Sequence, residues 1–338
     1  MFEFERPQRL TRSVTPNLSS ITWNPVQTQS LLGVLGGLGT TANSAVPRMG
    51  FDHPTPELPR IGRAAITGNR LRSQSRTASG ERHEIGFAQN TNVSLTMDYS
   101  DAMIKLPWSL RDQWNRAVGA IGIDQILSKV AAEAVANTEE AEFVATCWKN
   151  GVWTTQYLTG TVPKWTNFAS DPVSQVNTAK RAVQKACSRK PNSMIIPAAL
   201  ADALCIHPKM RSYQRGGQGA PVDQALEYSD LARIFKIEKL TVAERIQNNG
   251  TDLLETSMSL DFSITDGCLL FVDDGNGPTT ASAMIRAGYN PIGTAQGQGV
   301  AIDSGTDQKN RYDWWNILRQ AGYNVLDANA AAWFEDLI

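Results

Sequence analysis

Residues 165–197 read WTNFASDPVSQVNTAKRAVQKACSRKPNSMIIP, and this stretch predicts a helix followed by a short buried strand. Asp171 suits an N-cap, and Pro172 fits the first helical position because an N–H there would have no helical acceptor. Apolar side chains then share one helical face up to about Arg189, at Val173, Val176, Val183 and Cys187. Residues 192–196 end in an apolar run, which is typical of a short buried strand.

Downstream of this stretch, helical and strand patterns alternate. We expect a helix from Pro197 through Leu204, a second over about 226–235, and strands over 237–242 and 268–272. Such alternation is typical of an α/β unit. Residues 214–221 (QRGGQGAP) carry too little side chain to pack and predict a mobile loop. Four aromatic residues of the tail predict a docked C-terminus: Trp314, Trp315, Trp333 and Phe334.

Upstream, the chain predicts a strand and then a long helical unit. Residues 93–99 alternate apolar and polar side chains, as in a half-buried strand, and residues 102–106 alternate again. Helical spacing begins at about Leu110, but the apolar stripe rotates after Gly119 and Gly122. We therefore expect a kink or two consecutive helices that end near Trp148.

The first 82 residues have the composition of an arm and a basic loop. Residues 1–59 are rich in proline and include a Gly-rich run at 33–39, so they predict an extended arm that lies on another surface, such as a second subunit. Residues 60–82 then predict a basic loop or hairpin tip, because six arginines face one acid, Glu81: Arg60, Arg63, Arg70, Arg72, Arg76 and Arg82.

Composition excludes several protein classes. The chain has 338 residues, 41% of them apolar and 19% charged, enough for two domains or one large domain with extensions. Its formal net charge of -1 gives no overall attraction to nucleic acid or an anionic membrane. No signal peptide or membrane-spanning run is found, so we expect a cytosolic product. The four cysteines lack CxxC spacing and predict buried thiols rather than a zinc site or disulfides: Cys147, Cys187, Cys205 and Cys268.

The sequence shows no catalytic, cofactor or metal motif. The Gly-rich run at 33–39 lacks nucleotide-binding spacing, and Asp273-Asp274-Gly275 is typical of a turn. Glu139, Glu140 and Glu142 predict a solvated helix face. The three histidines form no partnership with a nucleophile; His207 is expected to end a helix, and His53 and His83 lie in loop-like stretches. We therefore expect no enzyme activity and no cofactor.

Four short motifs follow one another along the chain. They are Trp165 with Asp171-Pro172 before a helix, Pro191-Asn192 before a strand, Leu204-Cys205-Ile206-His207-Pro208 at a helix end, and Leu231-Ala232-Arg233-Ile234-Phe235-Lys236-Ile237 leading into a strand. In this order they resemble the major capsid proteins of tailed bacteriophages. The resemblance implies an α+β fold of the HK-ninety-seven type and a structural protein without an active site. It also implies self-assembly into hexamers and pentamers of an icosahedral shell around double-stranded DNA.

The resemblance further implies a division of the chain. Residues 1–59 would be an N-terminal arm and 60–98 an extended E-loop, followed by a P-domain with a long spine helix at 99–189. Residues 190–300 would be an A-domain, whose Gly216–Pro221 loop faces the hexamer or pentamer axis, and 301–338 would return to the P-domain. The expected location is the virion shell, assembled in the host bacterial cytoplasm without a membrane.

The basic residues are candidates for contacts with neighbouring subunits or with DNA. We favour subunit contacts for the arginines at 60–82, because this region maps to the E-loop. Arg6, Arg9 and Arg12 of the arm could bind packaged DNA through sequence-independent phosphate contacts, although Glu3 and Glu5 weaken that case.

Two departures from the family bear on partners and chemistry. Because the sequence begins at Met1, we expect no cleaved scaffolding region and therefore a separate scaffolding protein, with a portal and optional decoration proteins. Residues 60–98 contain no lysine, which argues against the covalent cross-linking known in some members. The alternatives are an encapsulin-like compartment shell and, from another class, an α/β enzyme or ligand-binding protein with an unrecognised site.

Overall fold

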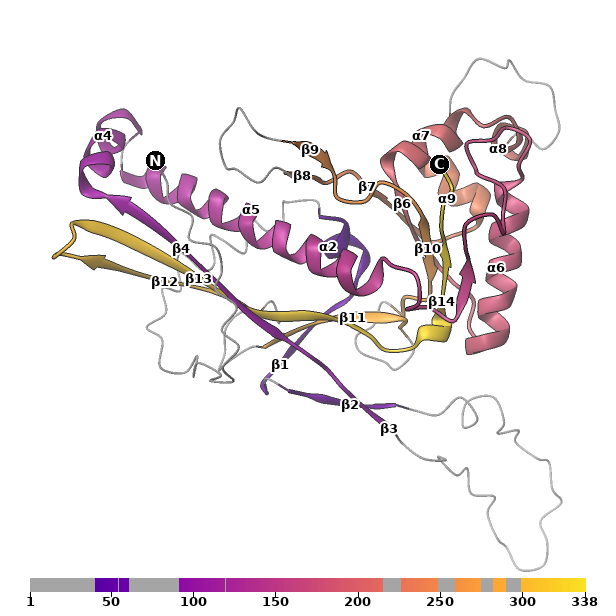
Figure 1. Ribbon diagram of the computed structural model, residues 1–338, viewed down its shortest axis with the longest axis horizontal. Coiled ribbons are helices and arrows are strands. Elements are labelled where there is room, and N and C mark those ends of the chain that lie inside the picture. The colour runs from indigo at the N-terminus through magenta and orange to yellow at the C-terminus, as the bar shows by residue number, and fades with distance from the viewer. Residues whose placement is uncertain are drawn as a thin grey trace, which may run out of the picture.

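The computed structural model describes residues 40–53, 55–60, 91–118, 120–214, 226–248, 259–274, 282–289 and 299–338. These residues form two packed units, each built on a five-stranded sheet (Figure 1). Two short ribbons project from the units, and the described residues at both ends of the chain, Thr40 and Ile338, belong to the packed parts.

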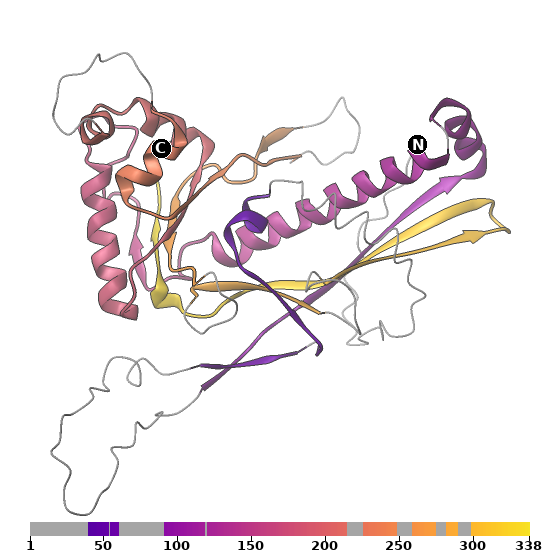
Figure 2. The same ribbon diagram turned by 180° about the vertical axis from the view of Figure 1, so that it is seen from behind.

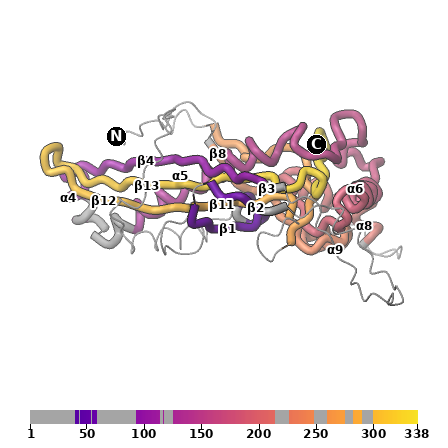
Figure 3. Tube along the Cα trace, turned by 90° about the horizontal axis from the view of Figure 1, so that it is seen from below, coloured from indigo at the N-terminus to yellow at the C-terminus, as the bar shows by residue number. Residues whose placement is uncertain are grey.

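The first unit is a sheet covered by a long helix. Its central strand β13 (Tyr312–Val325) pairs antiparallel with β12 (Val300–Asp307), β4 (Asp98–Pro107) and β11 (Met284–Tyr289), and β11 pairs parallel with β1 (Arg48–Phe51). Seen from below in Figure 3, β4, β13 and β12 run side by side along the long axis. Helix α5 (Ala120–Cys147) packs on β13, and α4 (Trp108–Val118) precedes it.

The second unit packs a group of helices against a mixed sheet (Figure 2). The strand order is β5 (Thr155–Tyr157), β14 (Ala331–Phe334), β10 (Cys268–Phe271), β6 (Ser193–Pro197) and β7 (Lys239–Ala243). The helices of this unit are α6 (Pro172–Cys187), α7 (Ala198–Ile206), α8 (Pro208–Gln214) and α9 (Tyr228–Phe235). The largest apolar core lies here and includes Trp165, Phe235 and Phe334.

Three small elements complete the description. Helix α2 (Thr41–Ala45) packs against α5, and β2 (Glu57–Arg60) forms a ribbon with β3 (Thr91–Ser94). A second ribbon consists of β8 (Ile246–Asn248) and β9 (Leu260–Phe262), and a 3-10 helix, η4 (Ala328–Ala330), precedes β14.

Most of the expected elements are confirmed. The helical unit is two helices, α4, which ends at Val118, and α5, which begins at Ala120. The Asp171 carboxylate caps α6 by accepting a hydrogen bond from Ser174 N at 3.1 Å. The docked tail is confirmed as well, because β14 lies between β5 and β10 and buries Trp333 and Phe334.

One strand prediction differs from the structure. The alternation over 93–99 predicted a continuous strand, but β3 ends at Ser94 and β4 begins at Asp98. The backbone N–H of Thr96 donates to the side-chain Oδ1 of Asn324 at 2.9 Å, and Asn324 Nδ2 donates to Thr96 O at 2.9 Å. Gly322 permits this approach, since a Cβ there would lie 2.5 Å from Thr96 O. The Asn324 side chain thus makes the two backbone hydrogen bonds that a neighbouring strand would otherwise make with Thr96.

Each of the two sheets combines strands from distant parts of the chain. Strand β5 and helix α6 pack with β14 in the second unit, whereas β11 belongs to the sheet beneath α5. After β13 in the first sheet, the chain passes to the second sheet and forms β14 there. Each unit is therefore assembled from segments that are distant in sequence. The Gly216–Pro221 loop and the Gly-rich run at 33–39 lie outside the described residues.

Candidate functional site

The expected contact arginines lie almost entirely outside the described residues. This holds for Arg6, Arg9, Arg12, Arg63, Arg70, Arg72, Arg76 and Arg82. The backbone of Arg60 is described; it is the last residue of β2 and pairs with Thr91 of β3. The two strands of the β2–β3 ribbon therefore flank residues 61–90 in the sequence.

The prediction that Glu139, Glu140 and Glu142 form a solvated helix face is wrong for the first two. Glu139 is 2% exposed and Glu140 is 1% exposed. Position 139 lies at helical spacing on the buried apolar stripe of α5, whose members include Ala132, Val135, Ala136 and Phe143. This spacing could have indicated from the sequence that Glu139 is buried. A carboxylate on a buried apolar stripe requires a partner of opposite charge or a hydrogen-bond donor.

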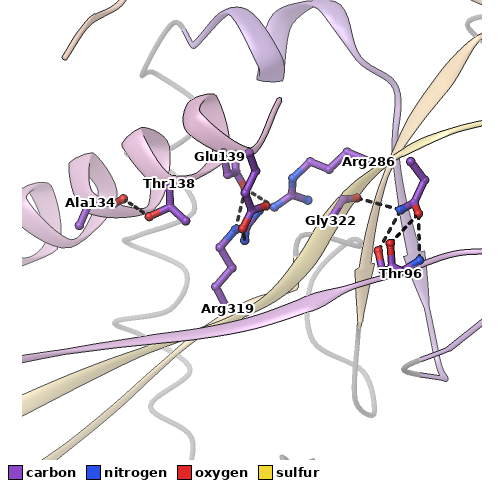
Figure 4. A network of polar contacts seen from close by, with 9 residues as sticks. Thr96, Ala134, Thr138, Glu139, Arg286, Arg319 and Gly322 are labelled. Atoms are coloured by element: carbon purple, nitrogen blue, oxygen red, sulfur yellow. Dashed lines mark hydrogen bonds and ion pairs between the residues drawn. The ribbon is translucent and has the colours of Figure 1, made fainter. Parts of the chain in front are cut away.

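The partners are two arginines of the sheet beneath α5. Arg286 of β11 donates to Glu139, and Arg319 of β13 lies with Nε 3.7 Å from Glu139 Oε1 (Figure 4). Arg319 also donates from both terminal nitrogens to the two oxygens of Glu142, at 2.7 and 2.6 Å. Both arginines are at most 2% exposed. We call Glu139, Glu142, Arg286 and Arg319 the charge network.

The electrostatics of Glu139 follow from this setting. Burial by itself would raise the pKa of the carboxyl, but the positive charges of Arg286, Arg319 and Arg48 together hold it below its usual value. Tyr323 lies among the same groups, and burial with the nearby Glu139 charge raises the pKa of its phenol. Glu139 is therefore ionised and Tyr323 neutral near neutral pH, so the charge network holds charges in place and does not supply a group that exchanges protons.

A second carboxylate on α5 joins three segments of the chain. Glu140 Oε2 accepts a hydrogen bond from Ala42 N at 3.1 Å, and Glu140 Oε1 accepts one from Ser263 Oγ at 3.1 Å. One turn away, Arg245 donates to Glu133 and, at 2.7 Å, to Asn137 Oδ1. Helix α5 thus holds α2 and, through Arg245 and Ser263, the base of the β8–β9 ribbon.

The histidine prediction is confirmed in its structural form. His207 is the C-cap of α7 and is fully buried, with Nε2 3.2 Å from Asn167 O. Burial lowers the pKa of its imidazole, so the ring is neutral near pH 7. His207 joins the turn before α6 to the start of α8.

The cysteines are free thiols, three of them buried, and Cys187 is half-buried. Burial raises the pKa of Cys147 to about 12 and, with nearby Asp202 and Asp230, that of Cys205 to about 11, so these thiols are weak nucleophiles. Among the residues that the structure describes, no three or more His, Cys, Asp and Glu side chains are grouped to hold a metal ion. No described helix combines the length and apolar character that a membrane span requires.

Known proteins resemble this chain weakly in sequence and more extensively in fold. No family model matches the chain. The major capsid protein of Burkholderia phage BcepMu is 23% identical over 215 residues, which cover 62% of this chain and 65% of that protein. The match therefore spans less than two thirds of the relative's length.

Two solved structures share the fold. A phage-related protein from Bordetella bronchiseptica RB50 has a TM-score of 0.69 at 16% identity, covering 94% of this chain and 98% of its own. A virus-like particle from Pyrococcus furiosus has a TM-score of 0.53 at 11% identity, covering 91% and 97%. These likenesses confirm the α+β fold of the HK-ninety-seven type that the sequence implied.

Proposed function

We propose that this chain is the major capsid protein of a tailed bacteriophage, which assembles into an icosahedral shell around double-stranded DNA. The observation that carries the proposal is the fold shared over nearly the whole chain with a phage-related protein, combined with sequence similarity to a phage major capsid protein. The shared fold with a virus-like particle supports self-assembly. In this proposal the protein is structural and carries no enzyme activity.

The proposed division of the chain keeps three consecutive segments. Residues 99–189 act as the P-domain, with α5 as its spine helix, residues 190–300 act as the A-domain, and residues 301–338 return to the P-domain. Residues 1–59 act as the arm, and the β2–β3 ribbon forms the base of the E-loop at 60–98. Extended segments suit a shell, because they cover a neighbouring subunit while requiring little core of their own.

The proposed partners are other copies of the chain first, in hexamers and pentamers. The arginines at 60–82 contact neighbouring subunits, and Arg6, Arg9 and Arg12 contact packaged DNA. A scaffolding protein, a portal and decoration proteins complete the proposed assembly in the bacterial cytoplasm, and the mature location is the virion.

Electron microscopy with light scattering tests the proposal, on the chain expressed alone and with its neighbouring genes. Icosahedral particles of megadalton mass that contain DNA in the virion support it. A dispersed monomer or dimer in both preparations contradicts it. A shell that encloses an enzyme cargo and no DNA contradicts the phage assignment and favours an encapsulin-like compartment.

Deletion of residues 1–39 tests the arm separately. The deletion stops before α2, whose Ala42 and Ala45 are fully buried, so the remaining chain keeps its core. We expect a soluble folded protein, by circular dichroism, that no longer forms regular shells in micrographs. Normal particles from this variant would show that the arm is dispensable.

A further inference from the structure

The turn that follows α5 carries an Asn-Gly pair at its tip. Helix α5 ends at Cys147, and the chain then turns toward the second unit (Figure 1). Asn150 and Gly151 are both exposed. Trp148 and Trp153, on either side of the pair, are 8% and 1% exposed. An exposed tip thus lies between two residues that are packed in the core.

Hydrogen bonds fix the chain where it leaves this turn. Trp153 Nε1 reaches back across the turn and donates to Cys147 O, the last residue of α5, at 2.8 Å. Thr154 N donates to Ala328 O at 2.9 Å. The backbone therefore enters and leaves the turn at fixed points, and residues 149–152 are the part that has room to rearrange.

The reactive groups of the Asn-Gly pair are free at this tip. Gly151 has a φ of +86°, which fits the third position of a type II turn, and nothing lies within 4 Å of the place where a Cβ would be. Within the described part of the chain, the Asn150 amide makes no hydrogen bond and the Gly151 N–H has no carbonyl acceptor. No contact has to be broken before the two groups approach each other.

This combination is specific to Asn150 among the asparagines in the described ranges. Asn167, for example, is held at its side chain, because Oδ1 accepts from Ala169 N at 3.0 Å, and a bulky residue follows it. Asn150 is the one described asparagine that precedes a glycine. The other two Asn-Gly pairs of the chain, at 249–250 and 276–277, lie outside the described residues.

We propose that Asn150 is a site of spontaneous deamidation. The backbone nitrogen of Gly151 loses its proton to a base in solution and attacks Cγ of Asn150, since the deprotonated nitrogen is the nucleophile. A C–N bond forms, the bond from Cγ to the amide nitrogen breaks, and that nitrogen takes up a proton from water and leaves as ammonia. Glycine favours this step because it has no Cβ to hinder the approach.

Water then opens the succinimide ring at one of its two carbonyl carbons. Attack at Cγ breaks the new C–N bond and leaves aspartate at position 150. Attack at the backbone carbonyl carbon breaks the original peptide bond and leaves isoaspartate, whose main chain runs through the former side chain. In both cases the net change is the uptake of one water and the loss of one ammonia.

Both products disturb the end of α5. Aspartate places a negative charge beyond the C-terminus of the helix, where the last carbonyl groups carry the negative end of the helix dipole. Isoaspartate also lengthens the main chain by one methylene group between the buried residues Trp148 and Trp153. The turn has to take up this length between fixed points, which loosens the last turn of α5.

The test incubates the full-length chain at mildly alkaline pH and follows each asparagine by peptide mass spectrometry. Deamidation is read from the mass change of an amide converted to a carboxyl, and isoaspartate from methylation by an isoaspartyl methyltransferase. Asn150 should react at least about tenfold faster than Asn167, whose reaction requires a hydrogen bond to be broken. Equal rates at the two positions would overturn the inference.

A urea-unfolded sample shows whether the fold leaves Asn150 free to react. The native rate at Asn150 should lie within about threefold of the unfolded rate, because an exposed turn without hydrogen bonds opens at little cost in free energy. A native rate slower than this would mean that the fold protects Asn150, and the assignment would be wrong.

The variant Asn150→Gln isolates the effect on α5. Glutamine would have to form a larger ring and reacts far more slowly, while the pairs at 249–250 and 276–277 are unchanged. After equal incubation, wild type should melt about 2 °C below Asn150→Gln, although the two melt together before it. Equal melting temperatures, with position 150 deamidated, would overturn the effect on α5. The reaction needs only the chain and water, so it is expected whether or not the chain forms shells.

Discussion

The two units of this protein bury positive charge in different ways. In the sheet beneath α5, Arg286 and Arg319 are matched by the carboxylates of Glu139 and Glu142. In the helical unit, Lys180 of α6 is 5% exposed and donates to Phe235 O and, at 3.0 Å, to Lys236 O at the end of α9. One unit thus uses side-chain acceptors and the other uses backbone carbonyls.

The difference follows from where unpaired carbonyl groups occur. The last carbonyls of a helix have no partner within the helix and carry its negative dipole end, so α9 can accept from Lys180 without a carboxylate. The carbonyls of β11 and β13 are engaged in strand pairing on both sides. A cation buried on that sheet therefore needs a side-chain acceptor, and α5 supplies it.

The largest expected effect comes from breaking the charge network. Glu139→Gln should lower the free energy of unfolding by about 3–5 kcal/mol, because it removes the buried negative charge that faces Arg286 and Arg319. Urea unfolding of the unassembled chain measures this. Glu133→Gln on the same helix is the control: its carboxylate pairs with Arg245 but is 51% exposed, so the loss should stay below about 1 kcal/mol. Equal losses would show that burial does not set the strength of these pairs.

The sign of the pH dependence distinguishes the same two variants. Since the pKa of Glu139 is lowered in the folded protein, its stabilisation is present above the unfolded pKa of about 4.3 and is lost as pH falls through the folded value. Wild type and Glu133→Gln should therefore lose stability in acid more steeply than Glu139→Gln. Parallel acid unfolding curves would contradict the lowered pKa.

A paired replacement makes the comparison sharper. Glu139→Leu combined with Arg286→Met should come within about 2 kcal/mol of wild type, because an apolar pair of similar volume avoids desolvation of both charges. Arg319 keeps Glu142 as its partner in this variant. A double variant less stable than Glu139→Gln would show that the charges contribute more than their burial costs.

A smaller effect is expected where a side chain replaces a strand neighbour. Asn324→Ala should lower the free energy of unfolding by about 1–3 kcal/mol, since the backbone N–H and carbonyl of Thr96 lose their partners. Hydrogen exchange should show faster exchange at Thr96 with little change at β6. Unchanged protection at Thr96 would contradict the proposed role of the amide.

The smallest expected effect concerns the cation held by carbonyls. Burial, with the nearby charges of Lys190 and Lys236, lowers the pKa of Lys180 to about 8. Above pH 8 the folded state releases this proton before the unfolded state does, so the free energy of unfolding should rise by about 1–2 kcal/mol between pH 7 and 9.5. Lys180→Met should lack this rise in thermal unfolding curves. An identical pH profile in both proteins would disprove the shift.

Much of the second unit could be predicted from local sequence. The Asp171-Pro172 start of α6, the apolar run of β6 and the helix end at His207 are encoded by residues that are neighbours in the chain. The break between α4 and α5 was also visible, because the rotation of an apolar stripe is a local property.

The charge network and the exposure of Asn150 could not be predicted from local sequence. Glu139 stood on an apolar stripe, yet its adjacent acids suggested a solvated face; its partners come from β11 and β13, far along the chain. The Asn150-Gly151 pair is visible in the sequence, but its exposure depends on the packing around it, such as that of Trp148 against Trp333. No local sequence pattern specifies contacts between segments so far apart in the chain.

The sequence by itself determined the elements, their caps and the order of motifs, because capping and side-chain periodicity act over a few residues. Only the tertiary structure decided which strand crosses between the sheets, which carboxylates are buried and whether Asn150 is exposed. Those properties depend on the packing of distant segments, where burial sets whether a charge or a polar atom must find a partner.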